Sequence, residues 1–238
     1  MMPTVTIVIP FYNCPYIQEA LESAIHQTYP AVEIIVVDDG STRHADLIAP
    51  YTHRVYYLGK ANGGTAHALN HGFRHASGEY IAWLSSDDKF EPHKIERQMA
   101  FMLTHGLDVS YTAFSVIDQH SRITDPYRPA PMAGMADLCR QLSYSNPING
   151  CTVIAKKEWI AGVGMFNDHL PFTHDYDLWI RLAINGAKFG YMPDCLTKYR
   201  VHEQMGTIQH RARIAGEYQM VQNNYRNLLQ HVAAQLGG

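Results

Sequence analysis

Acidic and glycine-containing segments follow three short apolar runs, and these segments hold the residues that could do chemistry. Residues 38–41 (DDGS) follow VEIIVV, residues 62–64 (NGG) follow a run near residue 55, and residues 86–88 (SDD) follow YIAWLS. One such segment alone carries little weight, because Asp and Gly commonly end strands for reasons of turn geometry. Three together predict a polar site, since ligands of open parallel sheets bind beyond the carboxyl ends of the strands. Carboxylates there suit a hard divalent cation that holds phosphate oxygens.

Several common catalytic and nucleotide-binding motifs are missing. No GxGxxG follows the first apolar run and no GxxxxGK[ST] is present, which argues against a dinucleotide-dependent dehydrogenase and a P-loop NTPase. GxSxG and HExxH are absent too, which argues against the common hydrolases and zinc proteases. The four cysteines show no CxxC spacing, so we expect free thiols rather than a zinc or redox motif.

Composition narrows the class of protein further. The chain has 238 residues, of which 46% are hydrophobic, enough for a sizeable core without long disorder. Lys and Arg number 19 against 22 Asp and Glu, so no basic field for a nucleic-acid partner is present. No apolar run approaches the roughly 20 residues needed to cross a bilayer, and the N-terminus lacks a charged leader. These features predict a cytoplasmic protein.

The order of apolar runs and helical periodicities predicts an α/β fold. Residues 4–10 and 32–37 are β-branched runs, and apolar positions between them recur at helical spacing from Pro15 onward. This strand–helix–strand order is typical of a βαβ unit with parallel strands. Further strands are expected at residues 55–58 and 80–84, and helices at 65–76 and 92–105. The first 105 residues are therefore expected to form a doubly wound α/β half.

The second half has a less regular pattern. A strand is expected at residues 152–155, a loop with three prolines at 125–134, and a helix at 175–185. Residues 211–236 are expected to form one long helix, with apolar positions at 214, 218, 221, 225, 228 and 232. That 3.5-residue spacing suits a partner helix, but packing on the parent domain is favoured, with a homodimer contact as the alternative. Its polar face carries few Lys and Arg, so membrane binding ranks last for this segment.

Five motifs together resemble family 2 glycosyltransferases with the GT-A fold. In the order seen in that family, they are TVTIVIPFYN, VEIIVVDDGST, NGGTAHALNHGFRHASGEYIAWLSSDD, GVGMF and HDYDLWIRLA. The resemblance implies a metal-dependent enzyme that moves a hexosyl or N-acetylhexosaminyl group from a nucleotide-diphosphate donor, a UDP-sugar by expectation, to an acceptor hydroxyl. Inversion at the anomeric carbon and a role in polysaccharide or glycoconjugate assembly are implied as well.

The resemblance also implies how the chain is divided. A Rossmann-like, mainly parallel sheet would carry a C-terminal acceptor-side portion and the long terminal helix. Residues 1–106 would bind the nucleotide-sugar, residues 107–210 would supply the acceptor site and catalytic base, and residues 211–238 would form the terminal helix. Acceptor contacts are expected within residues 125–150. A saccharide or lipid-linked saccharide acceptor would allow peripheral work at the inner membrane face.

Nucleotide-binding residues are carried over from the resemblance. Pro10, Tyr12 and Asp39 would line the nucleoside pocket, with Asp39 accepting hydrogen bonds from a uracil-like edge or a ribose. Lys60 and Asn62 would touch phosphate or base. A simple turn before a glycine is the alternative role of Asp39.

Residues 86–88 correspond to the family's DxD-type metal motif, where Mn²⁺ or Mg²⁺ bridges the diphosphate. The sequence departs from this motif, because Ser85 stands at the first acidic position. Asp87 is therefore expected as a direct ligand or ribose contact, and Asp88 as a metal ligand or its orienter. His202 would lie near the metal and diphosphate, although a surface histidine is an equal alternative. A solvated turn is the alternative for the acidic pair.

Two aspartates near residue 176 are expected to play different roles. On a helix, positions two apart differ by roughly 200°, so Asp175 and Asp177 cannot serve one pocket. Asp177 stands four residues before Arg181, the spacing of an ion pair, whereas Asp175 shares its face with apolar residues. The resemblance likewise places the catalytic base, which takes the acceptor proton, at Asp175. His174 stands where the family often has Glu.

Two other functions remain open from the sequence. A sugar-nucleotide pyrophosphorylase would need a Gly-rich, basic loop after the first strand, and residues 10–13 (PFYN) supply neither feature. A catalytically decayed nucleotide-sugar-binding or scaffold protein has no need of an acceptor base. The carboxylates at positions 39, 87, 88 and 175 therefore count against it.

Overall fold

The apolar runs of the N-terminal half form four parallel strands. The computed structural model describes residues 2–129 and 134–237. Its first strands are β1 (Val5–Phe11), β2 (Val32–Asp38), β3 (Tyr56–Gly59) and β4 (Tyr80–Trp83). They pair in the order β3-β2-β1-β4. Helices cover both faces of β1, so nearly every side chain of that strand is buried and the run is continuously apolar. The predicted βαβ unit is confirmed.

Strands of the C-terminal half extend the same sheet with mixed polarity. They are β6 (Val109–Ile117), β7 (Ile123–Arg128), β8 (Ile154–Lys156) and β9 (Phe189–Arg200), together with the short β5 (Lys89–Phe90). β8 runs antiparallel between β4 and β6, while β6 and β9 are parallel. β5 pairs with β9, so the two predicted halves share one curled sheet. The boundary between these halves stays a prediction.

One predicted loop is in part a strand. The loop was expected over residues 125–134, but β7 extends as far as Arg128, and residues 130–133 lie outside the described residues. In the described part of the sheet β7 pairs with β6 alone, with register shifts near Val116. An edge strand tolerates Pro126 because a proline there need not donate to a neighbouring strand. Pro126, together with the two prolines that follow the strand, made the sequence pattern typical of a loop.

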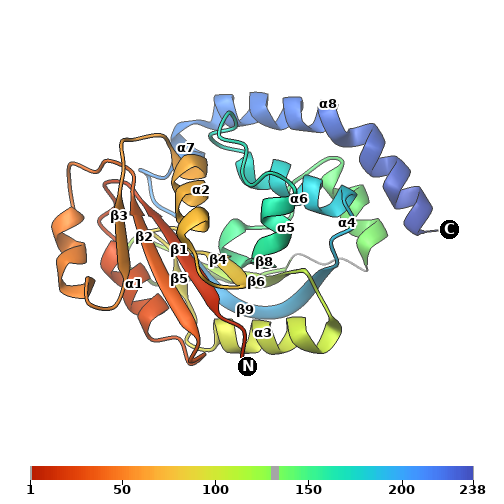
Figure 1. Cartoon of the computed structure of the whole chain (residues 1–238). Helices are drawn as coiled ribbons and strands as arrows, with labels where there is room; N and C mark the ends of the chain where they lie inside the picture. Colours follow the sequence, from red (N-terminus) through yellow and green to blue (C-terminus); the bar gives the residue numbers. More distant parts are fainter. Residues whose placement is uncertain (1, 130–133, 238) are drawn as a thin grey trace.

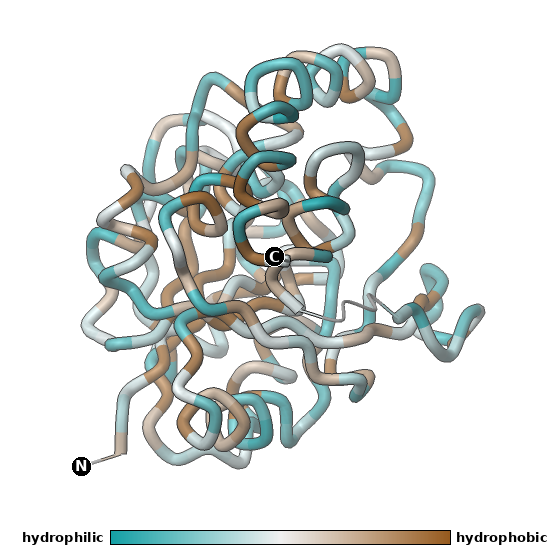
Figure 2. The backbone as a smooth tube through the Cα atoms, turned by 90° about the vertical axis from the view of Figure 1, so that its right-hand side faces the viewer, coloured by the Kyte–Doolittle hydropathy of each residue, from teal (hydrophilic) through white to brown (hydrophobic). Residues whose placement is uncertain are grey.

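Helices cover both faces of the sheet, as Figure 1 shows. One face packs on α1 (Ile17–Ile25), α3 (Lys94–His105) and the 3₁₀ segment Ala45–Tyr51. The other face packs on α2 (Thr65–His75), α4 (Met135–Leu142), α5 (Lys157–Gly162) and α6 (His174–Ile184). Each layer closes its own hydrophobic core against the sheet. Figure 2 shows the hydrophobic segments gathered in the middle of the molecule.

The terminal helix α8 (Arg211–Leu236) has the predicted bounds and packs on its own chain, against α4 and α6 (Figure 1). Its predicted apolar stripe is wrong at one place, because Leu228 is 45% exposed while Leu229 is fully buried. A straight helix has 3.6 residues per turn, which brings residues 221, 225, 229 and 233 onto one face instead. No helix of the described residues is long and apolar enough to span a membrane. The homodimer contact stays a prediction.

Replacing two adjacent leucines tests this register of α8. Leu229→Ala should lower the free energy of unfolding by about 2–5 kcal/mol, because removing this buried side chain leaves a cavity. Leu228→Ala should change that free energy by less than about 0.5 kcal/mol, as exposed substitutions do. Chemical denaturation of both variants measures the difference. Equal losses would mean that the 3.5-residue stripe is the packed face.

Two helical glycines form a second matched pair. A Cβ at Gly72 of α2 would lie 2.4 Å from Val8 Cγ1 and 3.1 Å from Val37 Cγ2, since α2 sits directly on β1 and β2. Gly72→Ala should therefore destabilise the protein by about 1–3 kcal/mol. A Cβ at Gly216 of α8 would meet no atom within 4 Å, so Gly216→Ala should stabilise the fold by about 0.5–1 kcal/mol. Thermal unfolding that moves both variants in one direction would contradict this packing.

Candidate active site

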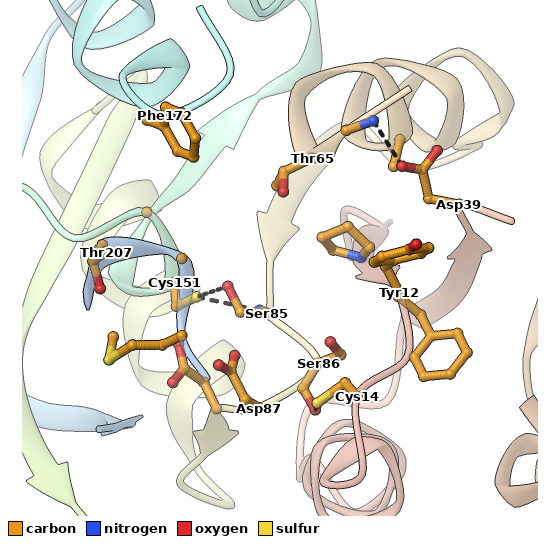
Figure 3. A pocket seen from close by; sticks show the side chains of 18 of the residues that line it. Tyr12, Cys14, Asp39, Thr65, Ser85, Ser86, Asp87, Cys151, Phe172 and Thr207 are labelled. Carbon is orange, nitrogen blue, oxygen red and sulfur yellow. Dashed lines mark hydrogen bonds between the residues drawn. The ribbon is translucent and has the colours of Figure 1, made fainter. Parts of the chain in front are cut away.

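A cavity of about 720 Å³ opens where the parallel strands end. Its walls come from the segments after β1, β2 and β4, from the 3₁₀ turn Gly150–Thr152, from the start of α6, and from α7 (Gly206–Gln209) with the start of α8. The predicted site residues that line it are Pro10, Tyr12, Asp39, Asn62, Asp87, Asp88, Asp175 and His202. Lys60 is outside the lining but contacts Asp39. In Figure 3, Asp39 and Phe172 lie on opposite sides of the cavity, and Asp87 lies below them.

Asp39 is held by the loop that precedes α2. Its carboxylate accepts hydrogen bonds from the backbone amides of Gly63 (3.0 Å to Oδ1) and Gly64 (2.7 Å to Oδ2). Lys60 Nζ forms an ion pair with Oδ1, and the Asn62 amide donates to the Asp39 carbonyl at 3.0 Å. The segment NGG therefore curls around this carboxylate. Asp39 is both a lining residue and the anchor of its loop.

The acidic turn after β4 carries two of the predicted metal ligands, Asp87 and Asp88, and the third, His202, contacts Asp87. His202 Nε2 lies 3.1 Å from Asp87 Oδ2. Asp88 is 1% exposed, and its Oδ1 accepts a hydrogen bond from the backbone amide of Arg200 at 2.8 Å. Its buried Oδ2 has no hydrogen-bond partner, and the Cys151 thiol lies near this carboxyl group. Burial, with the neighbouring charge of Asp87 as the second cause, raises the pKa of Asp88 well above its usual range.

The turn fits a divalent cation that takes part of its coordination from a bound nucleotide. Among residues 2–129 and 134–237, no three His, Cys, Asp or Glu side chains converge closely enough to hold a metal ion by themselves. Asp88 nevertheless lines the cavity, and its buried Oδ2 makes no hydrogen bond that a cation would have to displace. A cation bound by one or two carboxylates with phosphate oxygens needs no complete protein cage.

The two aspartates at the start of α6 lie as the helical geometry predicts. Asp175 lines the cavity, and its oxygens accept from the backbone amide of Tyr176 (2.7 Å) and from Asn146 Nδ2 (3.0 Å). Burial raises the pKa of Asp175. Asp177 forms the predicted ion pair with Arg181, at 2.7 Å between Oδ2 and Nη2. The two carboxylates therefore serve different surroundings.

His174 packs in an aromatic cage beside Asp175. Its ring centroid lies 5.5 Å from that of Trp83 and 5.4 Å from that of Phe166. Burial lowers the pKa of His174, so its imidazole is neutral at pH 7. The side chain that replaces the family's Glu thus adds no charge to the cavity.

Several lining residues carried no recognisable signal in the sequence. The Cys14 thiol donates to the Ser86 carbonyl at 3.3 Å, and the Cys151 thiol to Ser85 Oγ at 3.2 Å, so both cysteines brace the acidic turn. Of the described residues within 125–150, only Asn149 and Gly150 line the cavity. The rest of that wall comes from later segments, through Phe172, Met205, Thr207, His210 and Ile214.

A family model described as "Glycosyl transferase family 2" matches residues 6–158, more than half of the chain. The chain belongs to this family. An uncharacterised glycosyltransferase of Rickettsia typhi is 37% identical, over 86% of this chain and 66% of the relative. TuaG of Bacillus subtilis, a putative teichuronic acid biosynthesis glycosyltransferase, is 32% identical over 84% of this chain and 79% of its own length. The chain spans 66% of the length of the Rickettsia typhi relative and 35% of a Rickettsia felis relative.

Solved structures of low sequence identity share the fold. Residues 1–349 of Staphylococcus aureus TarS, in complex with UDP-GlcNAc, superpose with a TM-score of 0.73 at 19% identity, covering 92% of this chain and 65% of that one. The mannosyltransferase PcManGT of Pyrobaculum calidifontis, in complex with GDP-Man and Mn²⁺, gives 0.68 at 20% identity, covering 99% and 74%. The predicted GT-A fold is confirmed.

Proposed function

We propose that this protein is an inverting glycosyltransferase that moves a hexosyl or N-acetylhexosaminyl group from a UDP-sugar to a saccharide hydroxyl in polysaccharide or glycoconjugate assembly. The observation that carries the proposal is one cavity lined by Asp39, by the acidic turn Asp87–Asp88 and by Asp175. Family membership supports it. A further relative, the UDP-Glc:alpha-D-GlcNAc-diphosphoundecaprenol beta-1,3-glucosyltransferase WfaP of Escherichia coli, is 32% identical over 84% of this chain and 78% of its own length.

The nucleoside would bind at the Asp39 side of the cavity. Tyr12 offers a half-exposed aromatic ring against which a base can stack, next to Pro10. A uracil N–H would approach Asp39 where Lys60 Nζ now lies, which would free that ammonium for a phosphate. Asn62 would stay in place to hold the Asp39 carbonyl.

The diphosphate would bind at the acidic turn together with Mn²⁺ or Mg²⁺. Asp87, Asp88 and His202 are the residues that would hold the cation, and the imidazole favours Mn²⁺ over Mg²⁺, which prefers oxygen ligands alone. When bound, the cation neutralises the charge that develops on the leaving diphosphate. The Cys14 and Cys151 contacts keep the turn close to the cavity wall.

Asp175 would act as the general base. The acceptor oxygen forms a bond to the anomeric carbon as the bond from that carbon to the diphosphate breaks, and the Asp175 carboxylate takes the hydroxyl proton. Attack opposite the leaving group inverts the anomeric configuration. The raised pKa makes Asp175 a stronger base than an exposed aspartate, and Asn146 orients its Oδ2.

The acceptor would approach beside Phe172 and the α7–α8 segment, across the cavity from Asp39 (Figure 3). An aromatic side chain such as Phe172 suits the apolar face of a sugar ring. A lipid-linked saccharide is one such acceptor, and the reaction would then take place at the inner membrane face. Residues 107–210, which include Asn146 and Asp175, would form the acceptor half as predicted.

Replacing the base tests this mechanism. Asp175→Asn should lower kcat by about 10²–10⁴-fold, because a nearly isosteric amide cannot accept the proton. The affinity for UDP should stay near that of the wild type, since the amide lies away from the nucleoside side. Steady-state kinetics and calorimetric UDP titrations measure the two effects. Loss of UDP binding to the same extent as kcat would count against the assignment.

A neighbouring variant and a pH profile sharpen the same test. Asp177→Asn on the same helix should lower the melting temperature but leave the kcat of folded enzyme near wild type, because Asp177 serves the ion pair with Arg181.

In the wild type, kcat should fall as the pH drops through the raised pKa of Asp175, above the usual aspartate range, because protonation removes the base. A profile that is flat there would contradict the role of Asp175.

The metal site is tested by comparing UDP binding in Mn²⁺ and in EDTA. Asp87→Ala and Asp88→Ala should each weaken UDP binding in Mn²⁺ by about tenfold or more and have little effect on it in EDTA. Changes to residues that only support metal ligands already lower metal affinity by about tenfold, so losing a ligand should cost at least as much. Asp137→Ala is the matched control, since Asp137 pairs with Arg140 on α4 outside the cavity. If wild-type UDP binding is the same in Mn²⁺ and EDTA, the metal proposal is wrong.

A further inference from the structure

Arg200, the last residue of β9, is fully buried, and its guanidinium forms hydrogen bonds with other residues of the protein. Its Nε donates to the Asp87 carbonyl at 2.7 Å. Nη1 donates to the Asp118 carbonyl and to Ser121 Oγ, each at 3.0 Å, and Nη2 pairs with Glu19 Oε2 at 3.0 Å. A guanidinium has five N–H donors, and four hydrogen bonds leave little for a ligand. The charge of Arg200 is thus directed at the protein rather than into the cavity.

The same residue contacts the Asp88 carboxylate and the Asp87 backbone, and it is linked to His202 through Tyr16. Its backbone amide holds Asp88 Oδ1, which leaves Oδ2 as the free oxygen, and its Nε holds the backbone of Asp87. Its guanidinium carbon lies 4.4 Å from the centroid of the Tyr16 ring. That ring in turn lies 5.2 Å from the ring of His202, at 57° between planes. Arg200 and Tyr16 therefore form the support beneath the acidic turn.

We propose that Arg200, acting through Tyr16, is a positioning residue for the divalent cation of the glycosyltransferase. The inference rests on the proposed function, because it concerns the same cation. Arg200 fixes the backbone of Asp87 through its guanidinium and the carboxylate of Asp88 through its backbone amide, and the Tyr16 ring holds the His202 imidazole toward Asp87. Ligands held in advance lose less conformational freedom when the metal binds, and outer-shell partners commonly change metal affinity by about 10–100-fold.

The charge around Arg200 is balanced outside the cavity. Glu19 Oε2 also accepts from Lys89 Nζ at 2.9 Å, and Glu19 belongs to α1 rather than to the cavity lining. The residues that face the guanidinium therefore come from α1, from the turn after β4 and from the turn between β6 and β7. A purely structural role would join these segments without affecting the metal, so the test has to measure metal binding itself.

Tyr16 gives the sharper pair of variants. Its side chain makes no capping hydrogen bond at the start of α1 and does not line the cavity, so its replacement leaves both intact. Tyr16→Leu removes the ring between Arg200 and His202, whereas Tyr16→Phe keeps it. Electron paramagnetic resonance of Mn²⁺, with and without UDP, should show about 10–100-fold weaker Mn²⁺ binding in the Leu variant and near wild-type binding in the Phe variant.

Arg200→Lys tests the guanidinium itself. Lysine keeps the charge but has no planar fork for the four separate oxygen partners of Arg200, so Mn²⁺ affinity should fall by a similar factor. Arg181→Lys is the matched control, because Arg181 also joins a buried carboxylate to two backbone carbonyls, those of Val163 and Met165. It should lower the melting temperature without changing Mn²⁺ affinity.

The outcomes separate the inference from the function on which it rests. If the wild type binds Mn²⁺ and Tyr16→Leu binds it equally well, Arg200 and Tyr16 are structural and the inference is wrong, while the proposed function stands. The inference is also wrong if Arg181→Lys loses as much Mn²⁺ affinity as Arg200→Lys, since the effect would then follow stability. A wild type that binds no Mn²⁺, even with UDP, overturns both the metal site and the inference.

Discussion

A guanidinium without exposed surface must find its hydrogen-bond partners within the protein, and the arrangement of the cavity depends on how Arg200 finds them. Its partners lie on α1, on the turn after β4 and on the turn between β6 and β7. Removing these partners would leave the charge of a buried guanidinium uncompensated, so the segments are held in one arrangement. The acidic wall of the cavity is therefore built as a unit with the end of β9.

The carboxylates of the cavity are balanced in different ways, and this suits an anionic ligand. Lys60 neutralises Asp39, and His202 contacts Asp87, whereas Asp88 is buried with a raised pKa and one free oxygen. Burial and the charge of Asp87 thus disfavour the ionised form of Asp88, and an added cation at the turn after β4 would favour it. In the proposed reaction this is where a divalent cation and a diphosphate would meet, since each relieves the charge of the other.

The antiparallel strand β8 determines what faces the acidic turn. Because β8 lies between β4 and β6, it places the preceding turn Gly150–Thr152 against the end of β4. A Cβ at Gly150 would lie 2.1 Å from the Trp83 ring, so the close approach depends on a glycine there. Asn146, slightly earlier in the chain, reaches the carboxylate of Asp175. Asp175 and the acidic turn thus share one cavity although they lie far apart in the sequence.

Local pattern by itself determined the βαβ start, the opposite directions of Asp175 and Asp177, and the bounds of the terminal helix. Each follows from the geometry of one continuous segment, whose periodicity is readable without its neighbours. The resemblance to a known family supplied the roles proposed for Asp39 and for residues 86–88. Only the tertiary structure decided that β7 is an edge strand, that Leu229 rather than Leu228 is buried, and that Arg200 reaches Glu19. Those features depend on which distant segment packs against a residue. Contacts between distant segments produce no periodic pattern in the sequence, so they cannot be predicted from it.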